Sequence, residues 1–347
     1  MNDLVIPKPD DWHLHLRDGR AMASVVGYTA RSFGRALVMP NLRPPVVSVE
    51  MALAYRDRIL KALGPAEQSF NPYMALYLTD NTSAQEVRRA AETPEVLAYK
   101  LYPAGATTNS DSGVTDLSRC HAALEAMQET GMVLCVHGEV TDHQVDVFDR
   151  EARFIDDVLI PLRAKFPGLR IVFEHVTTKE AADYVRQAEG CIAATITPQH
   201  LLFNRNSLFK GGLRPHYYCL PVLKREPHRQ ALLQVATSGS PRFFLGTDSA
   251  PHSKDAKEMD CGCAGCFSAP HAMALYAQVF DGLGCLDRLA DFASRFGAQF
   301  YGLPVSEQTI TLTRGQSTIE TSLPYEDGDA QIVPLAAGEP LGWQLSL

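Results

Sequence analysis

The sequence predicts a (β/α)8 barrel, in which eight parallel strands form a closed ring inside a layer of helices. Eight short apolar runs occur along the chain, and helix-like segments follow most of them. The runs are continuously apolar rather than alternating, which is typical of parallel strands that are buried on both faces. Repeated strand–helix alternation indicates a parallel sheet, and eight units within about 250 residues have the count and length of this barrel.

The predicted strands, in chain order, are Asp11–Leu16, Arg35–Pro40, Tyr73–Leu78, Val96–Pro103, Met132–Glu139, Arg170–Thr177, Cys191–Pro198 and Arg242–Ser249. The helical candidates between them are Val49–Leu63, Ala84–Ala91, Leu117–Glu129, Asp149–Phe166 and Lys179–Ala188. The last of these helices begins with the pattern of a capping box, because Thr177 is followed three residues later by Glu180.

An open, doubly wound sheet is the alternative architecture. It usually has fewer strands, and no G-x-G-x-x-G follows the first apolar run. The segment Leu303–Leu347 is short and contains turn signals such as Asp327-Gly328, so we expect a C-terminal tail that packs on the barrel. Residues 1–347 are therefore expected to form a single domain.

The composition argues against several classes of function. Hydrophobic residues make up 46% of the 347 residues, which is enough for a sizeable core. The 32 basic and 40 acidic residues give a net charge of −8, which argues against nucleic acids and anionic membranes as partners. No apolar run is long enough to span a bilayer. Eight cysteines without a visible secretory signal are expected to be reduced thiols in the cytoplasm.

Two histidines one residue apart, His13 and His15, are the most informative feature of the chain. Residues i and i+2 of a strand point to the same side, so both imidazoles face one point. Converging neutral imidazoles are a common way to hold Zn²⁺ or a similar metal ion. The alternative is two ordinary histidines on a half-buried strand.

Further polar residues lie at the ends of the other predicted strands. In barrel enzymes the carboxyl ends of the strands carry the chemistry, so these side chains are expected to converge over one mouth. They are Arg17, Asn41, Lys100, His137, His175 and Asp248. The third and seventh strands contribute no comparable residue. Taken singly, the two later histidines could be core residues, and Asp248 could cap the next helix.

Lys100 is the hardest of these residues to explain as a structural one. It lies inside Leu97–Tyr102, a strand with few other polar groups, and lysine is almost never fully buried unless it is paired. Burial would lower the pKa of the amine and favour its neutral form. A neutral amine can add CO₂ to become a carbamate, which is a bidentate anion able to bridge two metal ions.

Two loops also bear on function. Residues 104–113 are rich in Gly, Thr, Asn, Ser and Asp, and they form either a solvated loop or a lid that closes over substrate with Thr107 and Thr108. Cys261, Cys263 and Cys266 could bind zinc or an iron–sulfur cluster, but no partner motif offers a fourth ligand. We favour a tight loop there whose backbone lies near the substrate.

Longer strings of residues resemble one family closely. These are Asp11–Gly19, Val38–Leu42, Lys100–Ala104, Thr107–Ser110, Val136–Glu139, Phe173–His175, Ala194–His200 and Gly246–His252. They are similar to the short-chain, class II dihydroorotases of the amidohydrolase superfamily. The resemblance covers about residues 7 to 304, and it implies the same barrel fold and a hydrolase of cyclic amides.

The resemblance implies a ligand set for two Zn²⁺ ions joined by a bridging hydroxide. His13, His15, Lys100 and Asp248 would hold the more buried ion. Carbamylated Lys100, His137 and His175 would hold the second ion. Asp248 would also act as the general base.

The resemblance also implies the substrate contacts and the reaction. Arg17, Asn41 and His252 would bind a carboxylate, backbone groups near Leu220, Ala264 and Gly265 would contact the ring amides, and Thr107 and Thr108 would lie on a mobile loop. The reaction is the reversible cyclisation of N-carbamoyl-L-aspartate to L-dihydroorotate in pyrimidine biosynthesis, and a homodimer is expected. Another cyclic-amide hydrolase, such as a hydantoinase, and a catalytically silent scaffold barrel are the alternatives.

Overall fold

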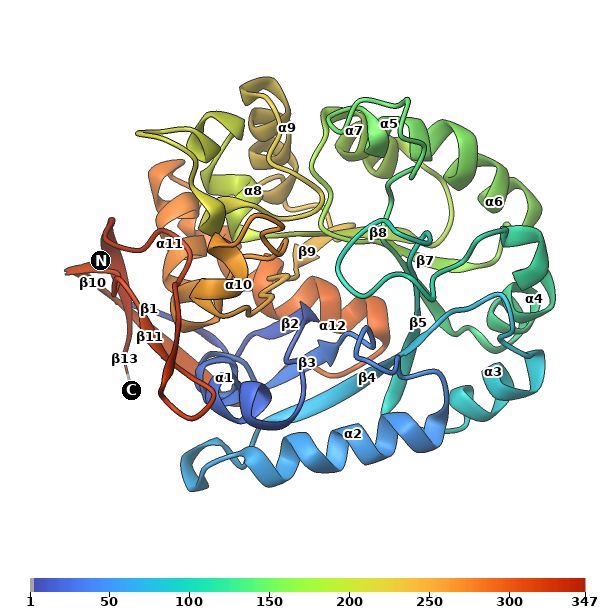
Figure 1. Ribbon diagram of the computed structural model, residues 1–347, viewed down its shortest axis with the longest axis horizontal. Coiled ribbons are helices and arrows are strands. Elements are labelled where there is room, and N and C mark those ends of the chain that lie inside the picture. Colours follow the sequence, from blue (N-terminus) through green and yellow to red (C-terminus); the bar gives the residue numbers. More distant parts are fainter. Residues whose placement is uncertain (1–2, 347) are drawn as a thin grey trace.

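The core of the molecule is an eight-stranded parallel barrel (Figure 1). The structure is a computed structural model that describes residues 3–346. Each strand of the barrel pairs with the next strand along the chain, in the order β2 to β9. The strands are β2 Asp10–Leu14, β3 Arg35–Val38, β4 Asn71–Tyr77, β5 Val96–Leu101, β6 Val133–Val136, β7 Arg170–Phe173, β8 Ile192–Ile196 and β9 Phe243–Leu245.

The ring closes between its first and last strands. The backbone N–H of His15 donates to the carbonyl of Ser249 at 3.1 Å, and the backbone N–H of Asp248 donates to the carbonyl of His13 at 2.8 Å. The buried carboxylate of Asp11 adds two bonds across the same seam, from the backbone N–H and the hydroxyl of Thr247 at 2.8 and 2.6 Å. The predicted barrel is therefore confirmed, and the open doubly wound sheet is excluded.

Helices surround the barrel (Figure 1). The twelve α-helices of the described residues are α1 Gly19–Ser32, α2 Val49–Ala62, α3 Ala84–Ala91, α4 His121–Thr130, α5 Arg150–Phe154, α6 Ile160–Lys165, α7 Lys179–Gln187, α8 Pro198–Leu202, α9 Glu226–Ala236, α10 Lys254–Glu258, α11 Ala272–Gly282 and α12 Phe296–Tyr301. All five helical candidates are present. The one predicted over Asp149–Phe166 consists of α5 and α6 joined by a π-helical turn, Ile155–Leu159.

The predicted cap of α7 is wrong by one residue. Thr178, not Thr177, is the N-cap, and its hydroxyl accepts a hydrogen bond from Ala181 N–H at 3.1 Å. The hydroxyls of both threonines donate to the carboxylate of Glu151 in α5, at 2.9 Å from Thr177 and 2.5 Å from Thr178. The two threonines differ in that the hydroxyl of Thr178 also accepts the bond from the first turn of the helix.

The amino-terminal end of the barrel is closed by apolar and aromatic side chains. α12 lies across this end, and Arg170 at the start of β7 donates to the carbonyl of Phe300 in that helix. The ring of Trp12 stacks on Tyr301 with 4.4 Å between centroids and 14° between planes. This close approach requires a glycine at position 297, since a Cβ there would lie 1.9 Å from the Trp12 ring nitrogen.

Strands also form outside the barrel, where the sequence analysis placed none. β1 Asp3–Pro7, β10 Thr309–Thr318 and β13 Pro340–Ser346 form an antiparallel sheet in the order β1-β10-β13, seen at the left of Figure 1. β11 Leu323–Tyr325 and β12 Ala330–Ile332 form a separate pair. The carboxyl-terminal segment packs on α11, where the indole N–H of Trp343 donates to Asp281 at 3.3 Å.

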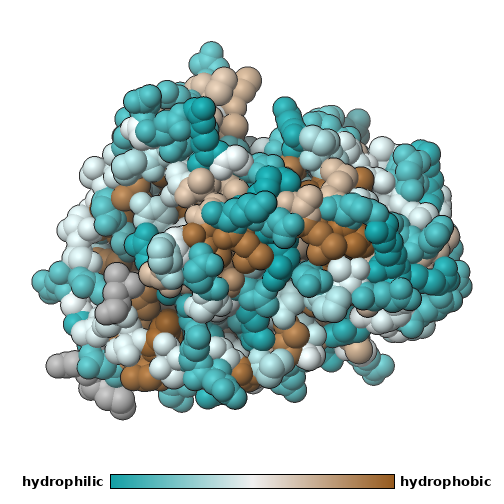
Figure 2. Space-filling view, turned by 90° about the horizontal axis from the view of Figure 1, so that it is seen from below, coloured by the Kyte–Doolittle hydropathy of each residue, from teal (hydrophilic) through white to brown (hydrophobic). Residues whose placement is uncertain are grey.

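The surface carries few extended apolar areas on the face seen from below. Hydrophilic residues predominate there, and apolar residues form several separate patches (Figure 2). Within residues 3–346 no helix combines the length and the hydropathy that a bilayer span requires.

Candidate active site

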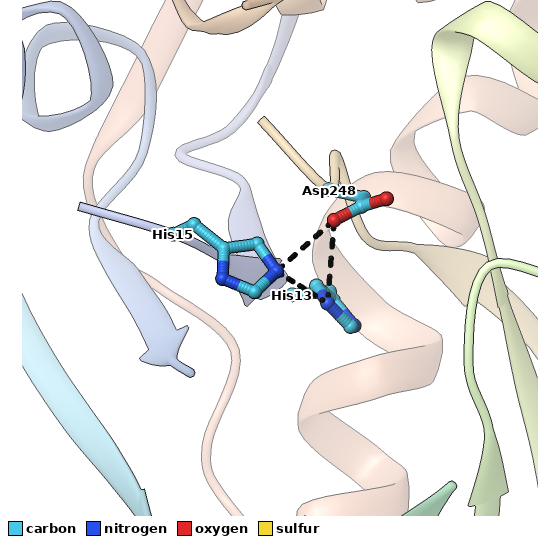
Figure 3. A group of neighbouring side chains, drawn as sticks. All are labelled: His13, His15 and Asp248. Carbon is cyan, nitrogen blue, oxygen red and sulfur yellow. Dashed lines mark hydrogen bonds and ion pairs between the residues drawn. The ribbon is translucent and has the colours of Figure 1, made fainter. Parts of the chain in front are cut away.

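Three predicted ligands meet at the carboxyl-terminal mouth of the barrel. The Nε2 atom of His13 lies 3.2 Å from Nε2 of His15, and Oδ1 of Asp248 lies 3.5 and 3.1 Å from these two nitrogens. The three side chains point toward one another (Figure 3). A tetrahedral zinc ion with Zn–N bonds of about 2.0–2.1 Å holds its ligand atoms roughly 3.3 Å apart. The observed separations therefore fit a single bound ion.

His137 and His175 extend the cluster on its other side. They follow β6 and β7, so they reach the same mouth as His13. The ring of His175 lies between the other two, with 4.9 Å between its centroid and that of His13 and 4.8 Å to that of His137. Its Nδ1 atom is buried and has no hydrogen-bond partner among the described residues. A second ion could use these two rings.

Lys100 is the last predicted ligand, and its side chain is fully buried, at an exposed fraction of 0%. Its Nζ atom has no hydrogen-bond partner within residues 3–346. Burial lowers the pKa of the amine, although the negative charges of Glu174 and Asp248 act in the opposite direction and raise it. An unpaired amine in such a place leaves a buried polar atom unsatisfied, which is costly. A carbamate on this nitrogen that binds metal would satisfy it, so the residue fits the bridging role.

Carboxylate and amide groups behind the cluster fix the orientation of three histidines. Nδ1 of His13 bonds to Oε2 of Glu174 at 2.9 Å, Nδ1 of His15 bonds to Oδ1 of Asn41 at 2.8 Å, and Nε2 of His137 bonds to Oε2 of Glu139 at 2.9 Å. Each bond leaves the opposite ring nitrogen free to face the centre of the site. Such partners hold the tautomer and raise the basicity of metal-binding histidines.

The electrostatic environment of the cluster keeps its histidines neutral and its aspartate ionised. Burial, together with the charge of Lys100, lowers the pKa of His13 well below its ordinary value, and burial likewise lowers the pKa of His15. Although burial alone would raise the pKa of Asp248, the hydrogen bond from His15 and the nearby positive charges lower it. Neutral imidazoles and an ionised carboxylate are the forms that bind divalent metals.

The seventh barrel strand does contribute to the site, contrary to the sequence-based expectation. Thr195 of β8 accepts a hydrogen bond from the backbone N–H of His175 at 2.7 Å, and its hydroxyl donates to Oε2 of Glu174 at 2.5 Å. Thr195 therefore orients both a predicted ligand and the carboxylate behind His13. Its role could not be read from the strand pattern, because threonine is common in strands.

The backbone is strained where three site residues leave their strands. Arg17, His175 and Asp248 have φ values of 64°, 41° and 46°. Non-glycine residues seldom adopt positive φ, and such strain is found where the surrounding structure holds a residue for function. The strain here directs three polar side chains into the mouth of the barrel.

A positively charged group lies at the other edge of the site. Nε of Arg17 donates to the carbonyl of Pro251 at 2.9 Å, and its Nη2 lies 2.8 Å from Nε2 of His252. The same imidazole nitrogen lies 3.1 Å from the carbonyl of Ala264. Burial lowers the pKa of His252 to about 2, so its ring is neutral. Arginine with a neutral hydrogen-bonding neighbour suits a carboxylate ligand.

The loop after β5 covers the site. The side-chain amide of Asn41 donates to the backbone carbonyl of Thr108 at 3.1 Å. The side-chain amide of Asn109 donates to the backbone carbonyl of Asn41 at 3.0 Å. The hydroxyl of Thr108 lies 3.4 Å from the carbonyl of Ala264, on the far side of the mouth. The space enclosed by the site residues is about 20 Å³. The space between the site residues is therefore narrow, with the loop lying over it.

Nearly all predicted site residues line this one space. Thr107, Thr108, Leu220, Ala264 and Gly265 lie around it with Arg17, Asn41 and five of the six predicted metal ligands. Lys100 and His252 are the two predicted site residues that do not line it. The buried amine of Lys257 donates to the carbonyls of Tyr218 and Gly265 at 2.8 and 2.6 Å, and so ties the two backbone segments together.

Several functional groups were missed by the sequence analysis. Glu139 and Glu174 stand within the quoted motif strings, beside His137 and His175, but no pattern indicated which side chain each would meet. Tyr102 lines the site and follows Lys100 by two residues. The strand period alone places it on the same face as Lys100, which was a usable signal.

The three cysteines of the loop do not converge as a group of ligand atoms. Cys261 is exposed, Cys263 is half-buried and Cys266 is buried, whereas the group of converging ligand atoms among residues 3–346 is that of His13, His15 and Asp248. The three thiols are free. The loop contributes the backbone of Ala264 and Gly265 to the mouth of the barrel.

A larger hollow of about 530 Å³ lies beside the site and is not part of it. Its wall is mostly apolar and includes Val114, Phe154 and Leu162, and none of the predicted site residues lines it. The chemistry resides in the smaller space because the ligating side chains converge there.

Comparisons with known proteins agree with this geometry. The sequence matches the amidohydrolase family over residues 4–307. Dihydroorotase of Ralstonia pickettii (strain 12J) is 63% identical over 341 residues, which is 98% of each chain. The solved dihydroorotase structure from Campylobacter jejuni is 36% identical to this chain, with a TM-score of 0.90. The dihydroorotase from Saccharomyces cerevisiae, solved in complex with 5-fluoroorotic acid, is 30% identical, with a TM-score of 0.91. Both cover 100% of this chain, and the matches cover 98% and 99% of theirs.

An L-hydantoinase from Arthrobacter aurescens shares the fold at 15% identity and a TM-score of 0.80, and that likeness concerns the fold alone. The barrel and the converging side chains define a hydrolase of the amidohydrolase type, with a metal centre at the mouth of the barrel. Within that family the chain belongs to the dihydroorotases.

Proposed function

We propose that the protein interconverts L-dihydroorotate and N-carbamoyl-L-aspartate at the mouth of the barrel. The observation that carries this proposal is the convergence of His13, His15 and Asp248 within 3.1–3.5 Å, together with the buried amine of Lys100, which has no partner among the described residues. Membership in the dihydroorotases supplies the substrate class. Ring opening adds water to a cyclic amide, and ring closure loses it.

The site takes two zinc ions in this proposal. His13, His15 and Asp248 hold one, His137 and His175 hold the other, and carbamylated Lys100 bridges them. The fit of the first three ligand atoms and the unpaired Lys100 amine support this assignment. When bound, such a pair of ions polarises the amide carbonyl and lowers the pKa of a water molecule toward neutrality.

Asp248 is the general base and acid. Water attacks the ring carbonyl carbon, and the carboxylate of Asp248 accepts the proton that this water loses. As the bond between carbon and ring nitrogen breaks, Asp248 returns the proton to that nitrogen. The lowered pKa of Asp248 supports the first step, because the group is ionised before substrate arrives.

Arg17, Asn41 and His252 bind the carboxylate of the substrate. The planar guanidinium of Arg17 can bind it in a bidentate manner, and the neutral ring of His252, which accepts a hydrogen bond from Arg17, helps to orient that guanidinium without adding charge. Backbone groups of Leu220, Ala264 and Gly265 contact the ring amides. The dihydroorotase of Saccharomyces cerevisiae has been solved in complex with 5-fluoroorotic acid, which is consistent with recognition of a ring acid.

The loop over residues 104–113 acts as a lid, with Thr107 and Thr108 as its contacts to substrate. Its bonds to Asn41 and Ala264 support a closed state, and the narrow space beneath it is consistent with an open state that admits the substrate. Closure excludes bulk water from the reacting groups.

We further propose that residues 1–347 act as one domain, in a cytoplasmic homodimer. The carboxyl-terminal strands pair with β1 and pack on α11, which supports a single unit, and the eight free thiols suit a reducing compartment.

A substrate comparison tests the proposed function. The purified protein should open dihydroorotate with kcat/KM at least a hundredfold higher than for hydantoin, as measured by loss of ring-amide absorbance. Asp248→Asn should abolish both activities, which controls for contaminating enzymes. Preference for hydantoin would favour the related hydrolase, and inactivity of the fully metallated protein on both rings would favour a scaffold.

A further inference from the structure

Tyr102 is a buried side chain of the site that the proposed function leaves without a task. It directly follows the last residue of β5, and it shares a face with Lys100 two residues earlier. Its exposed fraction is 1%, and it lines the same small space as His137 and Asp248.

The hydroxyl of Tyr102 has no hydrogen-bond partner among residues 3–346. Leaving a buried donor unsatisfied costs free energy, so phenylalanine would be the more stable residue if position 102 served only packing. Tyr77 and Tyr276 are satisfied, by bonds to Asn109 at 3.3 Å and to Ile196 at 2.7 Å. The hydroxyl of Tyr99 also lacks a partner, but Tyr99 does not line the site, whereas Tyr102 does. The unpaired hydroxyl of Tyr102 therefore suits a partner that is present only when substrate is bound.

The position of Tyr102 within the site identifies that partner. The centroid of the Tyr102 ring lies 6.3 Å from that of His137. The amine of Lys100 lies 5.2 Å from the Tyr102 centroid. These are residues of the metal end of the site, whereas Arg17 and His252 form the end that suits a carboxylate. The part of the substrate at the metal end is the reacting amide.

We infer that Tyr102 donates a hydrogen bond to the carbonyl oxygen of the reacting amide, an inference that rests on the proposed function. The O–H bond of the phenol stays intact. Negative charge grows on the carbonyl oxygen as water adds, so the hydrogen bond strengthens from the bound substrate to the transition state. Tyr102 is thus a further catalytic residue.

The ring of Tyr102 is held in place before substrate binds. Tyr77 packs against it with 5.0 Å between ring centroids and 34° between planes, and the hydroxyl of Tyr77 bonds to Asn109 in the covering loop. A donor that is fixed in advance needs no reorganisation as the reaction proceeds. The same contact connects the donor to the closed position of the loop.

The test compares Tyr102→Phe with Tyr99→Phe. Both residues come from the same stretch of chain, both hydroxyls are buried without a partner, and only Tyr102 lines the site. In Tyr102→Phe, kcat for dihydroorotate should fall about a hundredfold, as for removal of one oxyanion donor, while KM changes less than about threefold. The rate of ring closure should fall by the same factor, because the equilibrium constant is unchanged.

Metal content should match the wild type in both variants, the urea midpoint of each should be equal to or higher than that of the wild type, and Tyr99→Phe should keep its kcat. A kcat for Tyr102→Phe within twofold of the wild type would overturn the inference, as would equal losses in the two variants or a loss of bound metal. A higher KM with unchanged kcat would place the contact in the ground state and also overturn it. If the wild type itself does not open dihydroorotate, the proposed function fails first, and the two failures remain distinguishable.

Discussion

The two ends of the barrel use buried residues in opposite ways. At the amino-terminal end, Trp12 stacks on Tyr301 at 4.4 Å, and Gly297 leaves room for the indole. At the carboxyl-terminal mouth, the amine of Lys100 and the Nδ1 atom of His175 are buried without a partner. One end is close-packed and apolar, and the other holds polar atoms that the chain itself does not satisfy.

The difference shows which end bears stability and which bears function. Well-packed aromatic rings stabilise the fold, whereas unsatisfied polar atoms and the positive φ values of Arg17, His175 and Asp248 cost free energy. In barrels of this kind the amino-terminal face supports the fold and the carboxyl-terminal face carries the chemistry. Substitutions at the two ends should therefore separate stability from metal binding and activity.

The largest effect is expected at Lys100. Lys100→Ala removes the amine that would carry the carbamate, so bound metal should fall by at least one ion per chain. Ring-opening activity should fall by at least about a thousandfold, since metal-ion catalysis contributes several kcal/mol. Lys100→Met keeps most of the volume and should show the same losses without a loss of stability. Two bound ions and full activity in either variant would contradict the bridging role.

Gly297→Ala should act in the opposite way, on stability alone. The added Cβ would lie 1.9 Å from the Trp12 ring nitrogen, which forces the helix or the indole to move. We expect a loss of about 3 kcal/mol in the free energy of unfolding, from urea titration, with metal content per folded chain unchanged. Gly282→Ala is the control, because its Cβ would meet no atom within 4 Å. Equal stability of the two variants would contradict the close-packed description of this end.

The barrel strands and most of the candidate metal ligands could be predicted from the sequence. The strands could be predicted because parallel barrel strands are continuously apolar, and the ligands because His13, His15 and Lys100 stand out against such runs. The partners behind them could not, since Glu174 meets His13 across 161 residues and only the folded chain brings them together. The cap of α7 was misplaced by one residue because Thr177 and Thr178 are adjacent and both can cap a helix, so the local pattern does not distinguish them.

The strands outside the barrel were missed for a different reason. β10 alternates buried and exposed residues and is rich in threonine, so it lacks the continuous apolar run that marks the barrel strands. β1 is short, and its pairing with β10 joins the two ends of the described chain. Local patterns carry little information on such distant pairings.

A smaller effect on metal affinity is expected at Glu174 and Glu139. Glu174→Gln and Glu139→Gln keep the size of each side chain but weaken its hold on His13 or His137. Such changes behind a metal ligand typically reduce affinity by about 10–100-fold. Competition with a chelator would measure this, with exposed Glu129→Gln as the control. Wild-type affinity in both variants would show that these carboxylates only fill space.

The last effect, which appears only at acidic pH, is a pH dependence of stability at His200. This buried ring bonds to Thr197 and to the carbonyl of Pro221, and burial lowers its pKa to about 4. Between about pH 6.5 and pH 4 the unfolded chain binds a proton that the folded chain does not. Stability from this residue is therefore complete above pH 6.5 and is lost as pH falls, by up to about 1.4 kcal/mol per unit.

Urea titrations of the wild type and of His200→Gln across this range would measure that slope. The difference between the two slopes isolates His200 from the other buried histidines. Parallel slopes would contradict a neutral, buried His200.

The most direct test of the metal centre is the metal content of the wild type followed against its activity during removal by a chelator. We predict two zinc ions per chain at full activity, loss of ring opening as metal leaves, and recovery only when zinc and bicarbonate are both restored. Full activity in protein freed of bound metal would contradict the account.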